Sequence, residues 1–246
     1  MASKIQVDVR KSPEAVAEEA CRRVTELIRE KPDCVLGLAT GSTPEQTYRL
    51  LIEEYHQGLD FNRVTTFNLD EYWGLDGEHP QSYRYFMEER LFKHTNIRSW
   101  RTHVLNGMAR YPDLECGAFE AKIRASGGID LWILGIGQNG HIAFNEPGST
   151  ADSRTRLVAL SPSTIAANSD GRFFSNPADV PRCALTAGVG TIREARVLLL
   201  LATGDKKAQA IARAVHGDFS PECPASLLQD HTRCTFLIDE AAASLL

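Results

Sequence analysis

Short apolar runs alternate with helix-patterned segments along almost the whole of this 246-residue chain. Runs rich in Val, Ile, Leu and Phe are typical of buried strands, and apolar residues at helical spacing are typical of amphipathic helices. Strand-helix alternation predicts an α/β fold, a mostly parallel sheet flanked by helices. The expected strands are residues 34–38, 63–68, 130–134, 155–160, 196–203 and 234–238. One expected helix begins at Pro13, and four others span residues 44–56, 82–94, 113–125 and 206–215.

No change of composition marks a boundary between two domains, and no repeat or low-complexity tract interrupts the pattern. A chain of this length can form one large α/β domain that buries roughly 70 to 75% of its unfolded surface. We therefore expect a single domain over residues 1–246.

Charge and composition exclude several classes of function. With 27 Lys and Arg against 32 Asp and Glu, the formal net charge is −5, so a nucleic-acid partner is not expected. The six cysteines form no C-x-x-C pair, which argues against a zinc site and against a disulfide framework. The N-terminus has no apolar signal segment, and the longest apolar run, residues 197–202, is far too short to span a bilayer. We expect a cytoplasmic protein with no membrane partner and no metal.

Ligands of open α/β sheets bind beyond the carboxyl ends of the strands, so the chemistry should follow the predicted strands directly. Five segments meet this condition: residues 40–44, 70–72, 135–146, 186–191 and 204–207.

Two of these segments start a helix. In residues 40–44, Thr43 is placed to cap the helix and Pro44 to begin it, and the free N–H groups of a helix start suit a phosphate. An ordinary tight turn is an equally good interpretation. Residues 204–207 repeat the arrangement, with Lys206 and Lys207 at a position unfavourable for the helix dipole. An anion bound by one of these lysines, or a solvated lysine, would explain them.

Residues 135–140 match the dinucleotide pattern G-x-G-x-x-G, but NAD is disfavoured because the next predicted strand ends without an acid to hold a ribose. A glycine-rich turn that a ligand can approach closely remains, and it leads into His141 and Glu146. A carboxylate can orient the ring of such a histidine for acid–base work, although a lone histidine is usually structural.

Asp70 follows an apolar strand, which would carry its carboxylate to the edge of the sheet. Buried surroundings would raise its pKa toward that of a working base. An acidic loop exposed to water is the alternative, and spacing does not separate the two.

Taken together, six stretches of the chain resemble the glucosamine-6-phosphate deaminase family, in the family's order. They are Thr40-Gly-Ser-Thr-Pro44, Phe67-Asn-Leu-Asp-Glu-Tyr72, Glu78-His-Pro-Gln-Ser-Tyr83, Gly135-Ile-Gly-Gln-Asn-Gly-His-Ile-Ala-Phe-Asn-Glu-Pro147, Ser153-Arg-Thr-Arg156 and Ala184-Leu-Thr-Ala-Gly-Val-Gly-Thr191. The resemblance implies a Rossmann-like fold shared with 6-phosphogluconolactonases and ribose-5-phosphate isomerases. It also implies an enzyme that converts glucosamine 6-phosphate and water to fructose 6-phosphate and ammonia.

The resemblance implies roles for single residues. Asp70 would be the base that moves a proton between C2 and C1, and His141, supported by Glu146, the acid–base group that opens the sugar ring. Asn139 stands where some members carry Asp, and because an amide cannot share protons we expect it only to orient His141. No metal and no cofactor is implied. Phosphate binding would fall to Thr40, Gly41, Ser42, Thr43, Arg172 and Lys207.

The insertion of Asp170 and Gly171 relative to some members makes Arg172 a weaker candidate than Lys207. Some members are hexamers activated by N-acetylglucosamine 6-phosphate at a subunit interface. Arg156 and Ser149 match that site, but Val158 stands where those enzymes have lysine. We therefore expect weak or absent activation, and both a monomer and a homo-oligomer stay open.

Three alternative functions are a 6-phosphogluconolactonase, a sugar-phosphate-binding module without turnover, and a deaminase of galactosamine 6-phosphate. The chain has Asp70-Glu71-Tyr72 at the position where lactonases carry a motif like Asp-Glu-Arg, which argues against a lactonase. It also retains the catalytic groups that a binding module would lose. The epimer differs at one hydroxyl that the sequence does not place. Residues 78–83 and 161–174 are candidates for a lid over the sugar.

Overall fold

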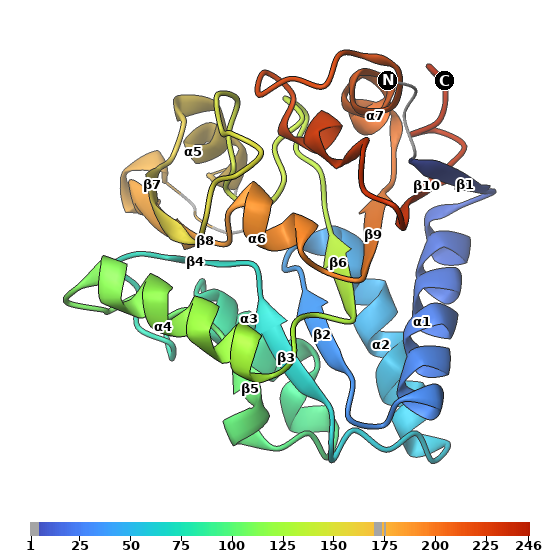
Figure 1. Cartoon of the computed structure of the whole chain (residues 1–246), viewed down its shortest axis with the longest axis vertical. Helices are drawn as coiled ribbons and strands as arrows, with labels where there is room; N and C mark the ends of the chain where they lie inside the picture. The colour runs from blue at the N-terminus through green and yellow to red at the C-terminus, as the bar shows by residue number, and fades with distance from the viewer. Residues whose placement is uncertain (1–4, 170–173, 175) are drawn as a thin grey trace.

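The computed structural model describes residues 5–169, 174 and 176–246, and its centre is a seven-stranded parallel sheet. The strand order is β1-β10-β9-β6-β2-β3-β5 (Figure 1). After the edge strand β1, the chain runs outward from the middle twice, first through β2, β3 and β5 and then through β6, β9 and β10. The predicted α/β class is thereby confirmed. The strands are β1 (Gln6–Arg10), β2 (Val35–Leu38), β3 (Thr65–Asn68), β5 (Thr102–His103), β6 (Leu131–Leu134), β9 (Val197–Ala202) and β10 (Cys234–Asp239).

Helices cover both faces of this sheet. Figure 1 shows α1 and α2 together on one side and α4 on the other, where the rings of Phe67 from β3 and Phe119 from α4 meet edge to face at 5.4 Å. The helices are α1 (Pro13–Glu30), α2 (Ser42–His56), α3 (Tyr83–Arg90), α4 (Pro112–Ala125), α5 (Pro162–Asn168), α6 (Val189–Arg193) and α7 (Ala208–His216). Short 3-10 helices are η1 (Phe92–His94), η2 (Ser99–Arg101), η3 (Pro177–Asp179), η4 (Asp205–Lys207) and η5 (Pro224–Leu228). None of the helices in the described part of the chain is long and apolar enough to cross a membrane.

A second, three-stranded antiparallel sheet was not predicted. Its strands are β4 (Asp70–Tyr72), β8 (Cys183–Thr186) and β7 (Arg156–Ala159), and β8 lies between the other two. The run expected as a strand at residues 155–160 therefore joins this sheet rather than the parallel one. The sheet has a small apolar core of its own, which contains Tyr72, Phe144, Leu160, Phe174, Val180 and Ala184.

Several predicted helices and strands begin or end at other residues in the structure. The helix expected over residues 82–94 stops at Arg90 and continues as η1, and the one expected over residues 206–215 starts as the 3-10 turn η4 before α7. The strand expected over residues 63–68 begins only at Thr65. Terminal turns often tighten in this way because the last backbone groups lack α-helical partners.

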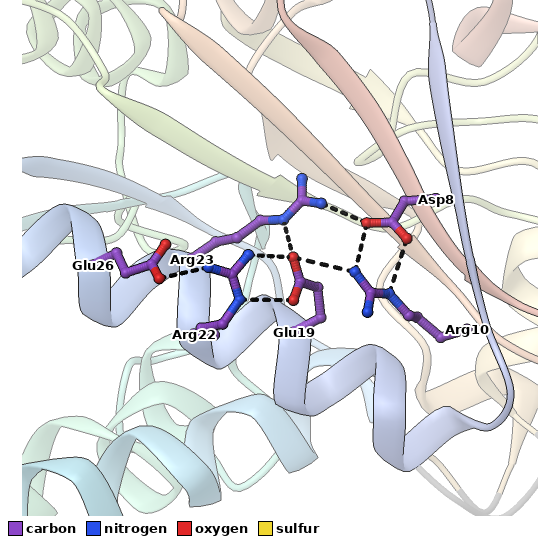
Figure 2. Close-up of polar contacts among 6 residues, drawn as sticks. All are labelled: Asp8, Arg10, Glu19, Arg22, Arg23 and Glu26. Carbon is purple, nitrogen blue, oxygen red and sulfur yellow. Dashed lines mark hydrogen bonds and ion pairs between the residues drawn. The ribbon is translucent and has the colours of Figure 1, made fainter.

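The edge strand β1 is held to α1 by a cluster of ion pairs (Figure 2). The Glu19 carboxylate contacts three guanidinium groups, with N–O distances of 3.4 Å to Arg10, 2.6 Å to Arg22 and 2.7 Å to Arg23. Arg23 also reaches Asp8 of β1 at 2.6 Å. These arginines hold the pKa of Glu19 down, at about 2. The cluster therefore joins the first two elements of the chain through a carboxylate that is only 8% exposed.

Candidate active site

A cavity of about 370 Å³ lies at the carboxyl ends of the parallel strands, where the sequence placed the chemistry. Segments that follow β2, β3 and β6 line it, and Lys207 joins them from the turn after β9. The predicted site residues that line this cavity are Thr40, Gly41, Ser42, Thr43, Asp70, Asn139, His141 and Lys207. Glu146 lies just behind Asn139, at 2.8 Å between Oε2 and Nδ2. Arg172 falls outside the residues that the structure describes.

One of the five predicted segments, residues 186–191, does not line the cavity. It supports the wall instead, because the Thr186 hydroxyl accepts a hydrogen bond from the backbone N–H of Phe144 at 3.2 Å. Four of the five segments therefore meet at one site.

The start of α2 forms one end of the cavity, and the predicted cap at Thr43 is wrong. The helix begins at Ser42, and Gly41 occupies the N-cap position with φ 101°, a left-handed conformation that favours glycine. Glycine has no side chain, so the N-cap residue itself makes no side-chain hydrogen bond to this helix start. A helix start of this kind attracts an anion through its dipole and its N–H groups.

Lys207 is the lysine that reaches the cavity, whereas Lys206 is exposed on the outside of the same turn. The Lys207 Nζ donates a hydrogen bond to the carbonyl of Ile136 at 2.6 Å, which fixes the ammonium at the cavity wall. Burial lowers the pKa of Lys207. A bound anion would stabilise the charged form of Lys207 and so offset the desolvation. The ammonium is therefore well placed to bind a phosphate.

Asp70 opens strand β4 and is buried, with 7% of its surface exposed, so the interpretation as an exposed acidic loop is wrong. Burial raises the pKa of this carboxyl well above its usual range, and the neighbouring Glu71 raises it further. The described residues supply no hydrogen-bond donor to its side chain. A carboxylate in such surroundings is a strong base for its type.

His141 is held by Asn139, and only indirectly by Glu146. The Asn139 Nδ2 donates to Glu146 Oε2 at 2.8 Å, so Asn139 turns its Oδ1 toward the ring and contacts Nδ1 of His141 at 2.8 Å. The same Oδ1 accepts the backbone N–H of His141 at 3.1 Å. An amide oxygen only accepts, so Nδ1 must carry the proton, and Nε2 is the nitrogen free to exchange one.

Glu146 lies 3.7 Å from the ring, which is too far for a direct hydrogen bond. The expected support of His141 by Glu146 is therefore indirect, because Asn139 makes hydrogen bonds to both side chains and orients the ring. Burial lowers the pKa of His141, the charge of Glu146 raises it, and the charge of Lys207 lowers it. The proton affinity of the ring thus depends on both neighbours.

The sequence did not single out Thr164, which holds the other side of Glu146. Its hydroxyl donates to Glu146 Oε1, and the Ser161 hydroxyl reaches the same oxygen at 3.0 Å. Both residues belong to the start of α5, inside the segment expected as a lid. The Ser-Pro start of that helix was a usable signal for a cap, but not for a contact with a carboxylate 18 residues away.

Tyr83 forms the wall beside Asp70, and its ring stacks on Phe144 with centroids 6.0 Å apart and planes 7° apart. Among the described residues, no group of three His, Cys, Asp or Glu side chains is arranged to hold a metal ion. The cavity therefore presents an anion-binding end, a buried carboxylate and an oriented imidazole.

This arrangement agrees with the comparison to known proteins. The family model for glucosamine-6-phosphate isomerases and 6-phosphogluconolactonase matches residues 8–237. The chain belongs to this family. The chain is 53% identical over 243 residues to a glucosamine-6-phosphate deaminase of Rhodopirellula baltica, covering 98% of this chain and 96% of that one. It is 51% identical over 232 residues to glucosamine-6-phosphate deaminase 1 of Giardia intestinalis, covering 94% and 86%.

Solved structures in the family show the same fold. A monomeric glucosamine-6-phosphate deaminase superposes with a TM-score of 0.95 at 42% identity, over 98% of this chain and 100% of that one. The 6-phosphogluconolactonase from Trypanosoma cruzi superposes with a TM-score of 0.79 at 22% identity, over 100% and 98%. The family thus includes two activities on one fold, and the site must distinguish between them.

Proposed function

We propose that this protein is an isomerising deaminase that converts glucosamine 6-phosphate and water to fructose 6-phosphate and ammonia. The observation that carries the proposal is the buried carboxylate of Asp70, which lines one cavity together with His141 and Lys207. Relatives about half identical over nearly the full chain are named for this activity. The substrate class is therefore an amino-sugar phosphate.

The phosphate of the sugar binds at the start of α2 and to Lys207. Residues 40–43 supply backbone and hydroxyl groups there, and the lysine supplies a full positive charge. Anchoring the phosphate fixes the sugar relative to Asp70, and a fixed distance between base and carbon is the entropic part of catalysis.

His141 opens the sugar ring. Because Nδ1 is held by Asn139, the ring exchanges protons through Nε2, which takes the proton of the C1 hydroxyl and gives it to the ring oxygen as the bond between that oxygen and C1 breaks. The open form has an aldehyde at C1, and the hydrogen on C2 becomes acidic only then.

Asp70 then takes the proton from C2 and returns it to C1. As C2 loses its proton, the aldehyde oxygen takes up a proton from the ammonium group of the substrate, which gives an enolamine with a double bond between C1 and C2. Protonation of C1 by Asp70 then leaves the nitrogen on C2 as an iminium group. Water adds to that iminium carbon and ammonia leaves, which gives the ketose. One carboxylate can serve both carbons because they are adjacent.

A lactonase is the second candidate because it shares the fold. Hydrolysis of a lactone needs an activated water but no base over C2. A buried carboxylate to which the described residues donate no hydrogen bond is costly unless a proton transfer uses it, and this favours the deaminase. A module that binds the sugar phosphate without turnover is disfavoured for the same reason.

Parallel assays in the presence of EDTA separate the candidates. We expect ammonia and fructose 6-phosphate in equal amounts from glucosamine 6-phosphate, and slow or no hydrolysis of 6-phosphogluconolactone. Turnover of the lactone alone would overturn the proposal and leave the fold intact. Binding of the amino-sugar phosphate without either product would indicate the binding module. Galactosamine 6-phosphate in the same assay decides the epimer.

A further inference from the structure

Glu71 is a second buried carboxylate beside Asp70, and the mechanism above does not use it. It is 1% exposed, and it is not among the residues that line the cavity. Successive side chains of a strand point to opposite faces, so Glu71 lies on the side of β4 away from the substrate. A buried charge in such a position needs an explanation.

Among the described residues, the hydrogen-bond donors to its carboxylate are all backbone amides. Oε1 accepts the N–H of Tyr72 at 2.8 Å and that of Tyr83 at 2.9 Å, and Oε2 accepts the N–H of Arg84 at 3.0 Å. The Arg84 guanidinium turns elsewhere, to the carbonyl and hydroxyl of Thr102 and to Glu88. Dipoles therefore stabilise the charge of Glu71 without a cation that would neutralise it.

These contacts join the strand of Asp70 to the start of α3. Glu71 takes the first two N–H groups of that helix, and Ser82 caps the third through a hydrogen bond from Tyr85 at 3.0 Å. Tyr83 is the first residue of α3 and lines the cavity beside Asp70. One side chain thus fixes the wall of the site and stands next to its base.

We propose that Glu71 is a positioning residue of the active site, whose charge sets the proton affinity of Asp70 and whose hydrogen bonds hold Tyr83 at the cavity wall. The inference rests on the proposed function, because it assigns Asp70 as the base. The other titratable side chains that line the cavity with Asp70 are Tyr83, His141 and Lys207. The side chains of Tyr72 and Tyr83 interact electrostatically with both Asp70 and Glu71.

The titration of the pair has a definite sign. Burial raises the pKa of Glu71 to about 7, against the three backbone donors, which lower it. Its negative charge raises the pKa of Asp70 beyond the effect of burial. Removing that charge lowers the pKa of Asp70, so the base form persists to lower pH.

The first test is the pH dependence of kcat/KM in Glu71→Gln. We expect its acidic limb to move to lower pH by about one unit relative to the wild type. Ser82→Ala disturbs the same helix start without changing a charge, and Glu71→Asp keeps the charge, so both should keep the wild-type limb. A folded Glu71→Gln variant with the wild-type limb would overturn the inference.

A second test does not depend on Glu71 variants or on activity. Carboxyl carbon NMR follows the titration of Glu71 in the wild type and in Asp70→Asn. Coupling between two groups is reciprocal, so we expect a lower midpoint for Glu71 once the charge of Asp70 is gone. An unchanged midpoint would overturn the inference even in an active deaminase, whereas loss of the deaminase activity would leave this measurement valid.

Discussion

Asp70 and Glu146 are carboxylates of one site with opposite surroundings. Glu146 accepts hydrogen bonds from Asn139, Ser161 and Thr164. The described residues donate none to the carboxylate of Asp70. These donors hold the Glu146 carboxylate in place, whereas Asp70 keeps its lone pairs for a proton. Separate environments for two acids are how one site can hold both a base and an electrostatic support.

At the same scale, Lys207 is expected to carry affinity for the phosphate. Lys207→Met removes the buried ammonium and should raise KM for glucosamine 6-phosphate about 10- to 100-fold, with a smaller effect on kcat. Lys206→Met removes an exposed lysine of the same turn and is the matched control. Steady-state kinetics check both variants, and an equal KM for the two would contradict the assignment of the phosphate site.

The local sequence predicted some of these site residues and not their contacts. Asp70 and His141 were found because they follow apolar strands, and a strand end is visible in the pattern. The cap at Thr43 was wrong because Gly41, in a left-handed conformation, starts the helix earlier. The hydrogen bonds that link Glu146, Asn139 and His141 depend on the shape of a loop, which residue type alone does not encode.

Helix α5 brings Thr164, which lines the cavity, into contact with Glu146. Thr164→Val keeps the shape of the side chain and removes the hydroxyl that donates to Glu146. We expect kcat to fall roughly 3- to 10-fold, since a charged acceptor loses a hydrogen bond. Ser169→Ala, which removes a hydroxyl bonded only to the carbonyl of Ala166 in the described contacts, is the control. Equal kcat values in the two variants would separate α5 from the chemistry.

The joint between β1 and α1 should make stability depend on pH (Figure 2). The pKa of Glu19 is about 2 in the folded protein, below its value of about 4.3 in an unfolded chain. Its stabilisation is therefore complete above about pH 5 and is lost as the pH falls toward 2. Glu19→Gln should lower the Tm by several degrees at pH 7, on the order of 4 °C, and not at pH 2.

Glu18→Gln changes an exposed neighbour on the same helix and serves as the control. Thermal unfolding followed by circular dichroism between pH 7 and pH 2 gives the comparison. A difference between Glu19→Gln and the wild type that stays constant with pH would contradict the ion-pair explanation.

Two of the strands that the sequence did not predict share one property. Strand β4 is Asp-Glu-Tyr, which has no apolar pattern. It forms a buried strand through its pairing with β8, a contact between segments far apart in the sequence. Strand β5 has two residues, too few to give a period. The central strands were predicted because their apolar runs are local, whereas these two depend on tertiary contacts.

For the molecule as a whole, we consider whether N-acetylglucosamine 6-phosphate activates the enzyme. Arg156 donates hydrogen bonds to Asn145 at 2.9 Å and to Ser149 at 3.1 Å, so its guanidinium already has partners within the chain. Val158 supplies no charge on the same strand. We expect N-acetylglucosamine 6-phosphate to leave the rate unchanged within about twofold, as judged by substrate saturation curves with and without it. A change from a sigmoidal to a hyperbolic curve would contradict this.

In the proposed reaction a single buried carboxylate, Asp70, moves the proton between adjacent carbons of an amino-sugar phosphate. The most direct measurement compares ammonia and fructose 6-phosphate released from glucosamine 6-phosphate by the wild type and by Asp70→Asn, without added metal. We expect equal amounts of both products from the wild type and a loss of turnover of at least about 10³-fold in the folded variant. A variant that retains a substantial fraction of wild-type turnover would contradict it.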